Sequence, residues 1–410
     1  VDSTELKSVH VCMVAYAVDP LHGSEPTNAW HWIDQMAQRV GRISLVTSTH
    51  GSERLQEMAR GGHHLPPNVD VVAVPSHRSA MAPPGPMWYR QYGGWLDEAA
   101  VAAADVNADL THHVMVGSPF WGSSLHLARG PRVLGPVGIS HSPPVWTAPR
   151  WGARGAMAEV TRGVLGAAPQ AWARGMAGVR GATHVLAADP RTAWMAHAAG
   201  RPWAKELLEG VADIDPNPDA RDLTLVWAGK LIPRKAPELA LRAWHEAQGS
   251  IPPEARLVMY GEGPLLEELR ILGRQLGVAD SVLLAGRVPQ PAVVAALRSS
   301  RGLLFTSLRD TSSTQILEAC ASGTPSVSLR HPGVNGLDLW YPRNAGWAAE
   351  AKSSRGAIRN LSSAIVACLN APDDEWAIRS ARCTEIASGQ TWEVKANRMA
   401  QLYLSMMSQG

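Results

Sequence analysis

Two acidic residues, Asp310 and Glu318, flank the start of a predicted helix in the stretch 307–327. This stretch reads as a buried strand, a polar loop and a helix that Gly323 ends. Small hydroxyl residues would meet unpaired backbone N–H groups at the helix start, where the helix dipole favours a phosphate: Thr311, Ser312, Ser313 and Thr314. Glu318, expected two turns inside a largely apolar helix, needs a polar partner such as two ribose hydroxyls. The pattern predicts a nucleoside diphosphate site; a capped helix with one exposed glutamate is the alternative.

Two further loops carry residues suited to the same chemistry. Lys230 and Lys235 follow the apolar run 223–229 and can converge on a diphosphate, although basic residues in such loops are often only solvated. Gly23 and Ser24 precede Pro26 after the first apolar run, and a glycine turn that opens a helix is a ready anion site. An ordinary turn and helix cap is the other interpretation of this second loop.

The elements that position these loops are strands and helices in alternation. Continuous apolar, β-branched runs indicate parallel strands buried on both faces. The expected strands are 9–17, 43–49, 69–75, 111–117, 132–138 and 183–189, then 223–229, 256–263, 281–287, 302–308 and 324–330. Helical stretches such as 238–248 and 264–277 separate most of them. The chain is therefore predicted to be α/β, with two doubly wound domains.

The predicted boundary lies at 211–222, a segment with two prolines and four aspartates. We expect an N-terminal Rossmann-like domain over 1–210, with a C-terminal helix at about 391–410 that can pack back on it, and a C-terminal domain over 211–390. Residues 139–180 are expected to form helices and loops that shape an acceptor pocket. A membrane-grazing patch there is a weaker alternative.

Composition narrows the classes of function. The 410 residues have a net charge of +2, which gives no reason to expect nucleic acid or an anionic membrane as the main partner. Apolar runs are shorter than a membrane-spanning helix needs, and the N-terminal residues lack the pattern of a signal peptide, so a cytoplasmic protein is expected. The four cysteines form no CxxC pair, and no metal cluster is visible; free buried thiols and a metal-independent protein are predicted.

These segments together resemble family 4 of the retaining glycosyltransferases, which have the GT-B architecture of two facing Rossmann-like domains with a cleft between them. The resemblance spans nearly the whole chain. GSEPTNAW (23–30) and VLGPVG (133–138) are similar to one branch of the family. AGKLIPRKAPELALRA, LVMYGEGPLLEEL, LLAGRVP and the 307–327 stretch are similar to the family in general, and the last is the most specific.

The resemblance implies a role for each matching residue. Gly23, Lys230 and Lys235 would bind the donor diphosphate, with Thr314 and Gln315 offering backbone N–H groups. Arg287 and Val288 would lie against the nucleotide base, Glu318 would hold the ribose, and Asp310 would contact the transferred sugar. Lys230 replaces the usual arginine and loses its planar fork. Asp310 replaces a glutamate, and Gly138 stands where many relatives have a histidine, for which His141 or His113 would be substitutes.

The predicted function is that of a retaining hexosyl-type glycosyltransferase. It would move a sugar from a nucleotide-sugar donor, UDP- or GDP-linked, to a small-molecule acceptor, as in natural-product biosynthesis. The donor itself is a substrate, and no cofactor is expected. Two alternatives are a nucleotide-sugar epimerase and a non-catalytic nucleotide-sugar-binding subunit. Membrane association is not expected, and the residues do not indicate the oligomeric state, the donor base or the acceptor atom.

Overall fold

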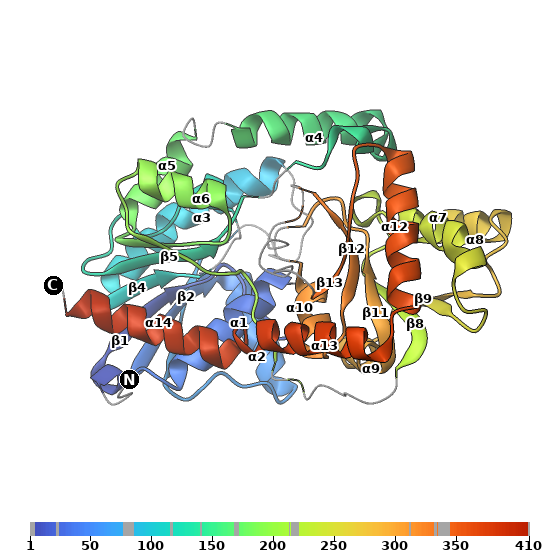
Figure 1. Ribbon diagram of the computed structural model, residues 1–410. Helices are drawn as coiled ribbons and strands as arrows, with labels where there is room; N and C mark the ends of the chain where they lie inside the picture. The colour runs from blue at the N-terminus through green and yellow to red at the C-terminus, as the bar shows by residue number, and fades with distance from the viewer. Residues whose placement is uncertain are drawn as a thin grey trace. The chain divides into compact units, whose positions relative to one another are not determined.

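The computed structural model describes residues 5–21, 24–76, 86–114, 118–139, 142–167, 172–212, 214, 221–310, 313–331, 334 and 345–408. The chain divides into two compact units (Figure 1). Unit 1 consists of 1–139, 167–210 and 392–410, and unit 2 of 140–166 and 211–391. The C-terminal segment therefore belongs to unit 1. Residues 140–166, which the sequence prediction placed in the first domain, belong by their contacts to unit 2.

Unit 1 is built on a seven-stranded parallel sheet of order β3-β2-β1-β4-β5-β6-β7. Its strands are β1 (His10–Val14), β2 (Arg42–Ser48), β3 (Val69–Val74), β4 (Leu110–His113), β5 (Arg132–Val137), β6 (His184–Ala187) and β7 (Trp203–Lys205). Its helices are α1 (Ser24–Ala37), α2 (Thr49–Arg60), α3 (Pro86–Asp105), α5 (Ala173–Gly181), α6 (Pro190–Ala198) and α14 (Trp392–Met407), with 3-10 turns η1 (Glu5–Ser8) and η2 (Pro119–Trp121).

Unit 2 repeats this plan with a six-stranded parallel sheet of order β10-β9-β8-β11-β12-β13. Its strands are β8 (Asp222–Ala228), β9 (Arg256–Tyr260), β10 (Val282–Gly286), β11 (Ser300–Phe305), β12 (Ser326–Arg330) and β13 (Gly346–Glu350). Its helices are α4 (Gly152–Ala167), α7 (Pro237–Ala247), α8 (Leu266–Gln275), α9 (Gln290–Ser299), α10 (Thr314–Ala321), α12 (Ser354–Leu369) and α13 (Asp373–Ser388), with 3-10 turns η3 (Val145–Trp151), η5 (Pro233–Lys235) and η6 (Gln248–Ser250).

The predicted α/β class and the two Rossmann-like domains are confirmed. Every predicted strand is present, most of them shorter than their apolar runs, while β7 and β13 were not predicted. β7 has three exposed residues, and β13 (GWAAE) is short and alanine-rich, so neither shows the apolar, β-branched run of a buried strand. Because α10 begins at Thr314, Glu318 lies one turn inside the helix rather than the two turns expected.

The strand order of each sheet reverses next to its first strand, between β1 and β4 in unit 1 and between β8 and β11 in unit 2. Ligands of doubly wound sheets bind beyond the carboxyl ends of the strands at this point. In unit 2 the loops that leave this point are the one after Ala228, which leads to Lys235, and the one after Phe305, which leads to Asp310. The topology therefore brings two separately predicted site residues to one place.

Candidate functional site

Two glycines, Gly229 and Gly261, allow the backbone conformation of the loop after β8. Gly229 has φ +154° and Gly261, after β9, has φ +141°, both in the region that favours glycine. A Cβ atom on Gly261 would lie 1.8 Å from the carbonyl oxygen of Gly229, so the two loops meet backbone to backbone. This close approach carries the chain into η5, which ends at Lys235.

The residues that directly follow β11 fix the backbone of η5 from the other side. The Thr306 hydroxyl donates to the carbonyl oxygens of Lys235 (2.9 Å) and Ala236 (3.0 Å). The same hydroxyl accepts a 2.9 Å bond from the Trp227 indole N–H. The N–H of Leu308 donates to the carbonyl of Arg234 at 2.8 Å. The position of Lys235 is thus set by hydrogen bonds from the loop that runs from β11 to Asp310.

Lys235 and Asp310 form an ion pair between Nζ and Oδ2, and their side chains are only 9% and 16% exposed. The carboxylate also accepts from the Ser307 hydroxyl at 3.3 Å, and Nη1 of Arg234 lies 3.8 Å from its second oxygen. The Lys235 ammonium group is 3.5 Å from Oε1 of Gln315, in the first turn of α10. Two cations and one carboxylate therefore gather beside the start of a helix, an arrangement that can bind a diphosphate and an adjoining hydroxyl group.

Ser313 caps α10 with φ +50° and is fully buried, and Thr314, the first residue of the helix, is half-buried. Glu318 is half-buried on the same helix, and its Oε1 accepts a 2.5 Å hydrogen bond from the side-chain amide of Gln290. The predicted ribose anchor is thus held by a polar partner from the start of α9. Thr311 and Ser312 lie outside the described residues.

Two other predicted donor-binding residues, Lys230 and Arg287, are more exposed to solvent than Lys235 and Asp310. The Lys230 side chain is exposed, so only Lys235 of the two predicted lysines is seen to pair with Asp310. Arg287, after β10, is 70% exposed and forms a 3.1 Å ion pair with Glu262, which follows β9. Val288 is half-buried beside it. Lys230 follows β8 and Arg287 follows β10, two strands of the same parallel sheet.

In unit 1, Ser24 begins α1, whereas Gly23 lies outside the described residues. The turn between β1 and α1 is held by Asp19, a buried carboxylate that accepts from the N–H of Leu21 (2.8 Å) and from Nε of Arg54 (2.7 Å). The backbone just before the predicted anion site is therefore held in place by Asp19, a contact that the sequence did not reveal.

Of the two histidines predicted as substitutes, His113 lies within the described residues and is buried. His113 ends β4 with 1% of its surface exposed, and its Nδ1 accepts a 3.4 Å bond from the N–H of Ser124. His141 lies outside the described residues.

Several residues of the unit 2 site were not predicted from the sequence. Ser307 and Arg234 contact Asp310, and the buried His331 donates from Nε2 to the carbonyl of Ser307 at 3.0 Å. Burial lowers the pKa of His331 to about 4, so it is neutral at pH 7. Ser307 and Arg234 follow strands, and that position was the available signal; the reach of His331 from β12 depends on the sheet order.

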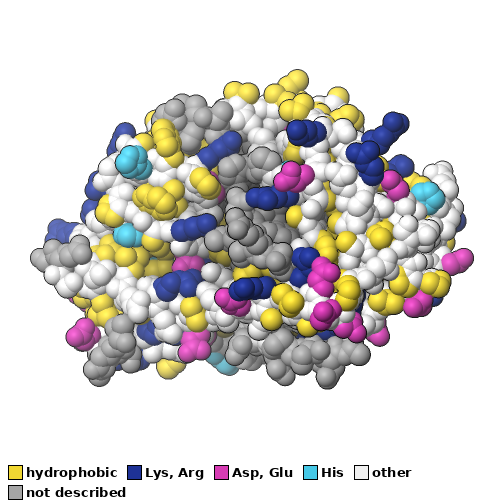
Figure 2. Space-filling view, viewed as in Figure 1, with side chains coloured by type: hydrophobic (Ala, Val, Ile, Leu, Met, Phe, Trp, Pro, Cys, Tyr) yellow, Lys and Arg dark blue, Asp and Glu magenta, His cyan; other side chains and the backbone are white. Residues whose placement is uncertain are grey.

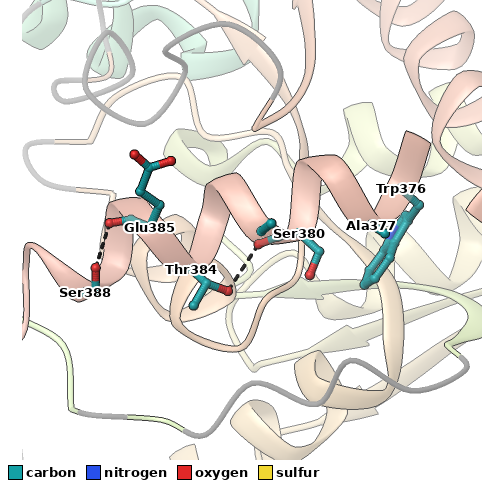
Figure 3. A pocket seen from close by; sticks show the side chains of 7 residues that line it. Trp376, Ala377, Ser380, Thr384, Glu385 and Ser388 are labelled. Carbon is teal, nitrogen blue, oxygen red and sulfur yellow. Dashed lines mark hydrogen bonds between the residues drawn. The ribbon is translucent and has the colours of Figure 1, made fainter. Parts of the chain in front are cut away.

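Two further features of the described surface are its charge pattern and one open pocket. Lysine and arginine are interspersed with acidic residues on the face that Figure 2 shows. An open pocket of about 400 Å³ lies along α13, lined by Trp376, Ser380, Thr384 and their neighbours (Figure 3). The Thr384 and Ser388 hydroxyls there bond to carbonyls of their own helix, and the pocket contains none of the predicted site residues. Within the described residues, no group of three or more His, Cys, Asp or Glu could hold a metal ion, and no helix is long and apolar enough to cross a membrane.

Comparison with known sequences finds relatives of the segment that contains this site. Residues 222–365 match the family described as "Glycosyl transferases group 1". A D-inositol 3-phosphate glycosyltransferase of Acidothermus cellulolyticus is 34% identical over 119 residues, 27% of this chain and 26% of that protein. A GDP-mannose-dependent phosphatidylinositol monomannoside mannosyltransferase of Mycolicibacterium smegmatis is 30% identical over 233 residues, 48% and 59% of the two chains. The matched stretches span 19% to 59% of the length of these and two further curated relatives.

Solved structures extend the likeness to the whole fold. Sucrose-phosphate synthase from Thermosynechococcus elongatus superposes with a TM-score of 0.66 at 12% identity and covers 98% of this chain and 100% of its own. Anabaena HepE in complex with UDP superposes with a TM-score of 0.63 at 17% identity over 97% and 99% of the two chains. The chain therefore has the GT-B fold of two Rossmann-like units, and its residues 222–365 are similar to the group 1 glycosyltransferases.

Proposed function

We propose that this protein is a retaining glycosyltransferase that moves a hexosyl group from a nucleotide-sugar to a small-molecule acceptor. The observation that carries the proposal is the pairing of Lys235 with Asp310 beside the first turn of α10, at the reversal point of the unit 2 sheet. This arrangement lies within the segment that matches the group 1 family. A phosphate-binding cation, a helix start and a carboxylate for a sugar hydroxyl are thus assembled on one side of the unit.

The proposed roles follow from the contacts. Lys235, supported by Lys230, neutralises the diphosphate, while the N–H groups of Thr314 and Gln315 receive its oxygens. Glu318 takes the ribose hydroxyls in place of the Gln290 amide, since both bind through the same carboxylate. Arg287 and Val288 lie against the base. Asp310 accepts a hydroxyl of the transferred sugar.

We infer a front-face displacement for the reaction. In unit 2 the carboxylate nearest the proposed phosphate site, Asp310, is bound to Lys235, so a two-carboxylate glycosidase scheme is disfavoured. The acceptor attacks the anomeric carbon as the bond to the diphosphate breaks, and the leaving phosphate oxygen takes the acceptor proton. Lys235 and the N-terminus of α10 stabilise the charge that develops on that oxygen. These groups also support a metal-independent reaction, for which unchanged turnover in excess chelator is the test.

The donor base is proposed to be uracil or guanine. A curated relative is named for GDP-mannose and a solved structural neighbour contains UDP. The acceptor is proposed to be a small soluble molecule, as in natural-product biosynthesis, although relatives are named for inositol phosphate and for lipids.

The test is a thermal-shift panel of UDP, GDP, ADP and dTDP, followed by turnover with the sugar-nucleotides of the stabilising base. We expect one nucleotide to raise the Tm clearly above the others and its sugar form to release the diphosphate slowly to water. A chain that none of the four stabilises would refute the proposal. Isomerisation of the donor without release would replace it with an epimerase.

A further inference from the structure

The segment 140–166 lies between β5 and β6 in sequence, yet its contacts are with unit 2. Two ion pairs attach it there. Nε of Arg150 binds Glu238 at 2.8 Å, and Nη2 of Arg150 donates to the Ser354 hydroxyl at 2.8 Å. The second ion pair joins Glu159, on α4, to Arg309 at 3.2 Å. A segment that lies between two unit 1 strands in the sequence thus contacts Arg309, the residue next to Asp310.

The Glu159–Arg309 pair is largely withdrawn from solvent. Its side chains are 11% and 19% exposed, whereas the Glu267–Arg270 pair on α8 is 67% and 51% exposed. An ion pair at such low exposure is screened weakly by water and salt, so it holds its geometry more firmly than a surface pair. Glu159 is therefore suited to fix the direction of the Arg309 guanidinium.

Arg309 is adjacent in sequence to Asp310, which already has two cations beside it, Lys235 and Arg234. The backbone carbonyl of Arg309 accepts from Nη1 of Arg234 at 2.7 Å and from the Ser307 hydroxyl at 3.1 Å. The same Arg234 nitrogen lies 3.8 Å from Oδ1 of Asp310. The backbone at 309 therefore connects the guanidinium of Arg234 to the carboxylate that is proposed to bind the sugar.

We propose that Glu159 is a positioning residue for Asp310: it holds the Arg309 guanidinium on α4 and so keeps a further cation off the Asp310 carboxylate. The inference rests on the proposed function of Asp310. A carboxylate that several cations occupy accepts a neutral sugar hydroxyl poorly, because opposite charges at a few ångströms attract far more strongly than a neutral donor does. By retaining Arg309, Glu159 leaves Asp310 with two cations rather than three, and one of the two, Lys235, is the proposed partner of the donor diphosphate.

The inference predicts a specific pattern among three variants. Glu159→Gln keeps the size of the side chain and removes its charge, so Arg309 turns towards Asp310 and kcat for sugar release falls about tenfold. The Kd for UDP or GDP stays within about twofold, because Lys235 and α10 are unchanged. Arg309→Gln alone has near-native turnover, and the double variant E159Q/R309Q recovers most of the loss. If Glu159 only held the segment in place, removing Arg309 as well would not restore kcat.

Two matched variants act as controls. Glu267→Gln breaks an exposed glutamate–arginine pair in the same unit and is expected to change nothing. Arg150→Gln breaks the other attachment of the segment, and adding R309Q to it restores no activity. Turnover is measured as release of nucleoside diphosphate from UDP-glucose and GDP-mannose with water as acceptor, below the Tm of each variant.

A crystal structure of the E159Q variant gives a readout that needs no turnover. We expect the Arg309 guanidinium within about 4 Å of the Asp310 carboxylate. If E159Q does not fold, Glu159→Asp keeps the charge but shortens the reach to Arg309; it is then expected to lower kcat, and R309Q is again expected to repair the loss. An E159Q protein with native kcat, or a loss that R309Q does not repair, or Arg309 unmoved in the crystal, would overturn the inference. A native rate in Asp310→Asn would instead show that the proposed function of Asp310 is wrong.

Discussion

Replacing Lys235 by Met is the most direct perturbation of the proposed donor site. The side chains of Lys235 and Asp310 are 9% and 16% exposed, so Lys235→Met leaves a largely buried carboxylate without its main partner. Removing one member of a fully buried pair costs about 3–5 kcal/mol. Asp310 keeps Ser307 at 3.3 Å and Arg234 at 3.8 Å, so we expect the lower figure of about 2–3 kcal/mol for the unfolding of unit 2.

The effect on ligand binding separates the two partners of the pair. A hydrogen bond to a charged group contributes about 1.5–3 kcal/mol, so K235M is expected to weaken UDP or GDP binding about 10- to 150-fold. Asp310→Asn leaves the lysine in place and removes its competitor, so nucleotide affinity is kept or improved while sugar transfer falls. The double variant D310N/K235M is expected to lose less stability than the two single losses added together, because no buried charge stays unpaired.

Isothermal titration calorimetry with UDP and GDP gives the affinities, and urea unfolding gives the stabilities. Lys352→Met, which removes an exposed lysine of the same unit, is the control and is expected to match the native protein in both measurements. The reasoning fails if K235M binds the diphosphate as tightly as the native chain. It also fails if D310N loses nucleotide affinity as severely as K235M.

Three further predictions concern other residues. Glu318→Gln should weaken binding of the favoured nucleoside diphosphate at least tenfold in calorimetry without changing the contacts to the transferred sugar. Native affinity would show that Glu318 is not the ribose anchor. Burial lowers the pKa of His112 to about 3, so its share of stability is complete above pH 6.5 and is lost as the pH falls towards 3, about 2 kcal/mol of it by pH 5. In urea unfolding, the loss between pH 7 and pH 5 should shrink by that amount in His112→Gln but not in the exposed-site control His63→Gln. Lys395→Met should destabilise unit 1 by about 3 kcal/mol, because the buried Glu206 loses its lysine partner and keeps only Arg398 at 3.0 Å. The double variant K395M/E206M should regain most of this stability. Equal losses of stability in the two variants would contradict the pairing.

The strands and the loops that follow them could be predicted from the sequence, because buried parallel strands leave continuous apolar runs. Of the residues singled out in the 307–327 stretch, Asp310 lies in the loop before α10, and Thr314 and Glu318 lie on that helix, since a polar loop between a strand and a helix is a local feature. The short strands β7 and β13 could not be predicted, because three exposed residues or an alanine-rich run carry no period or β-branched signal.

Contacts between distant segments were beyond a reading of local patterns. Lys235 pairs with Asp310 only because β8 and β11 are neighbours in the sheet, which the sequence order does not reveal. The position of 140–166 depends on Arg150 and Glu159, each a single charged residue in an arginine-, alanine- and glycine-rich segment. Without its partner, a single charged residue is predicted to lie exposed to solvent.

The ion pair between Lys235 and Asp310 gives the proposed site a property that neither residue has alone. With no ligand bound, the lysine intended for phosphate and the carboxylate intended for sugar satisfy each other at low exposure, so neither charge is left buried without a partner. A donor diphosphate would draw Lys235 towards itself and thereby free Asp310 at the moment the sugar arrives. Asp310→Asn should therefore bind a bare nucleoside diphosphate as well as or better than the native chain, yet bind the matching sugar-nucleotide worse. Equal changes in the two Kd values would mean that the lysine and the carboxylate act independently.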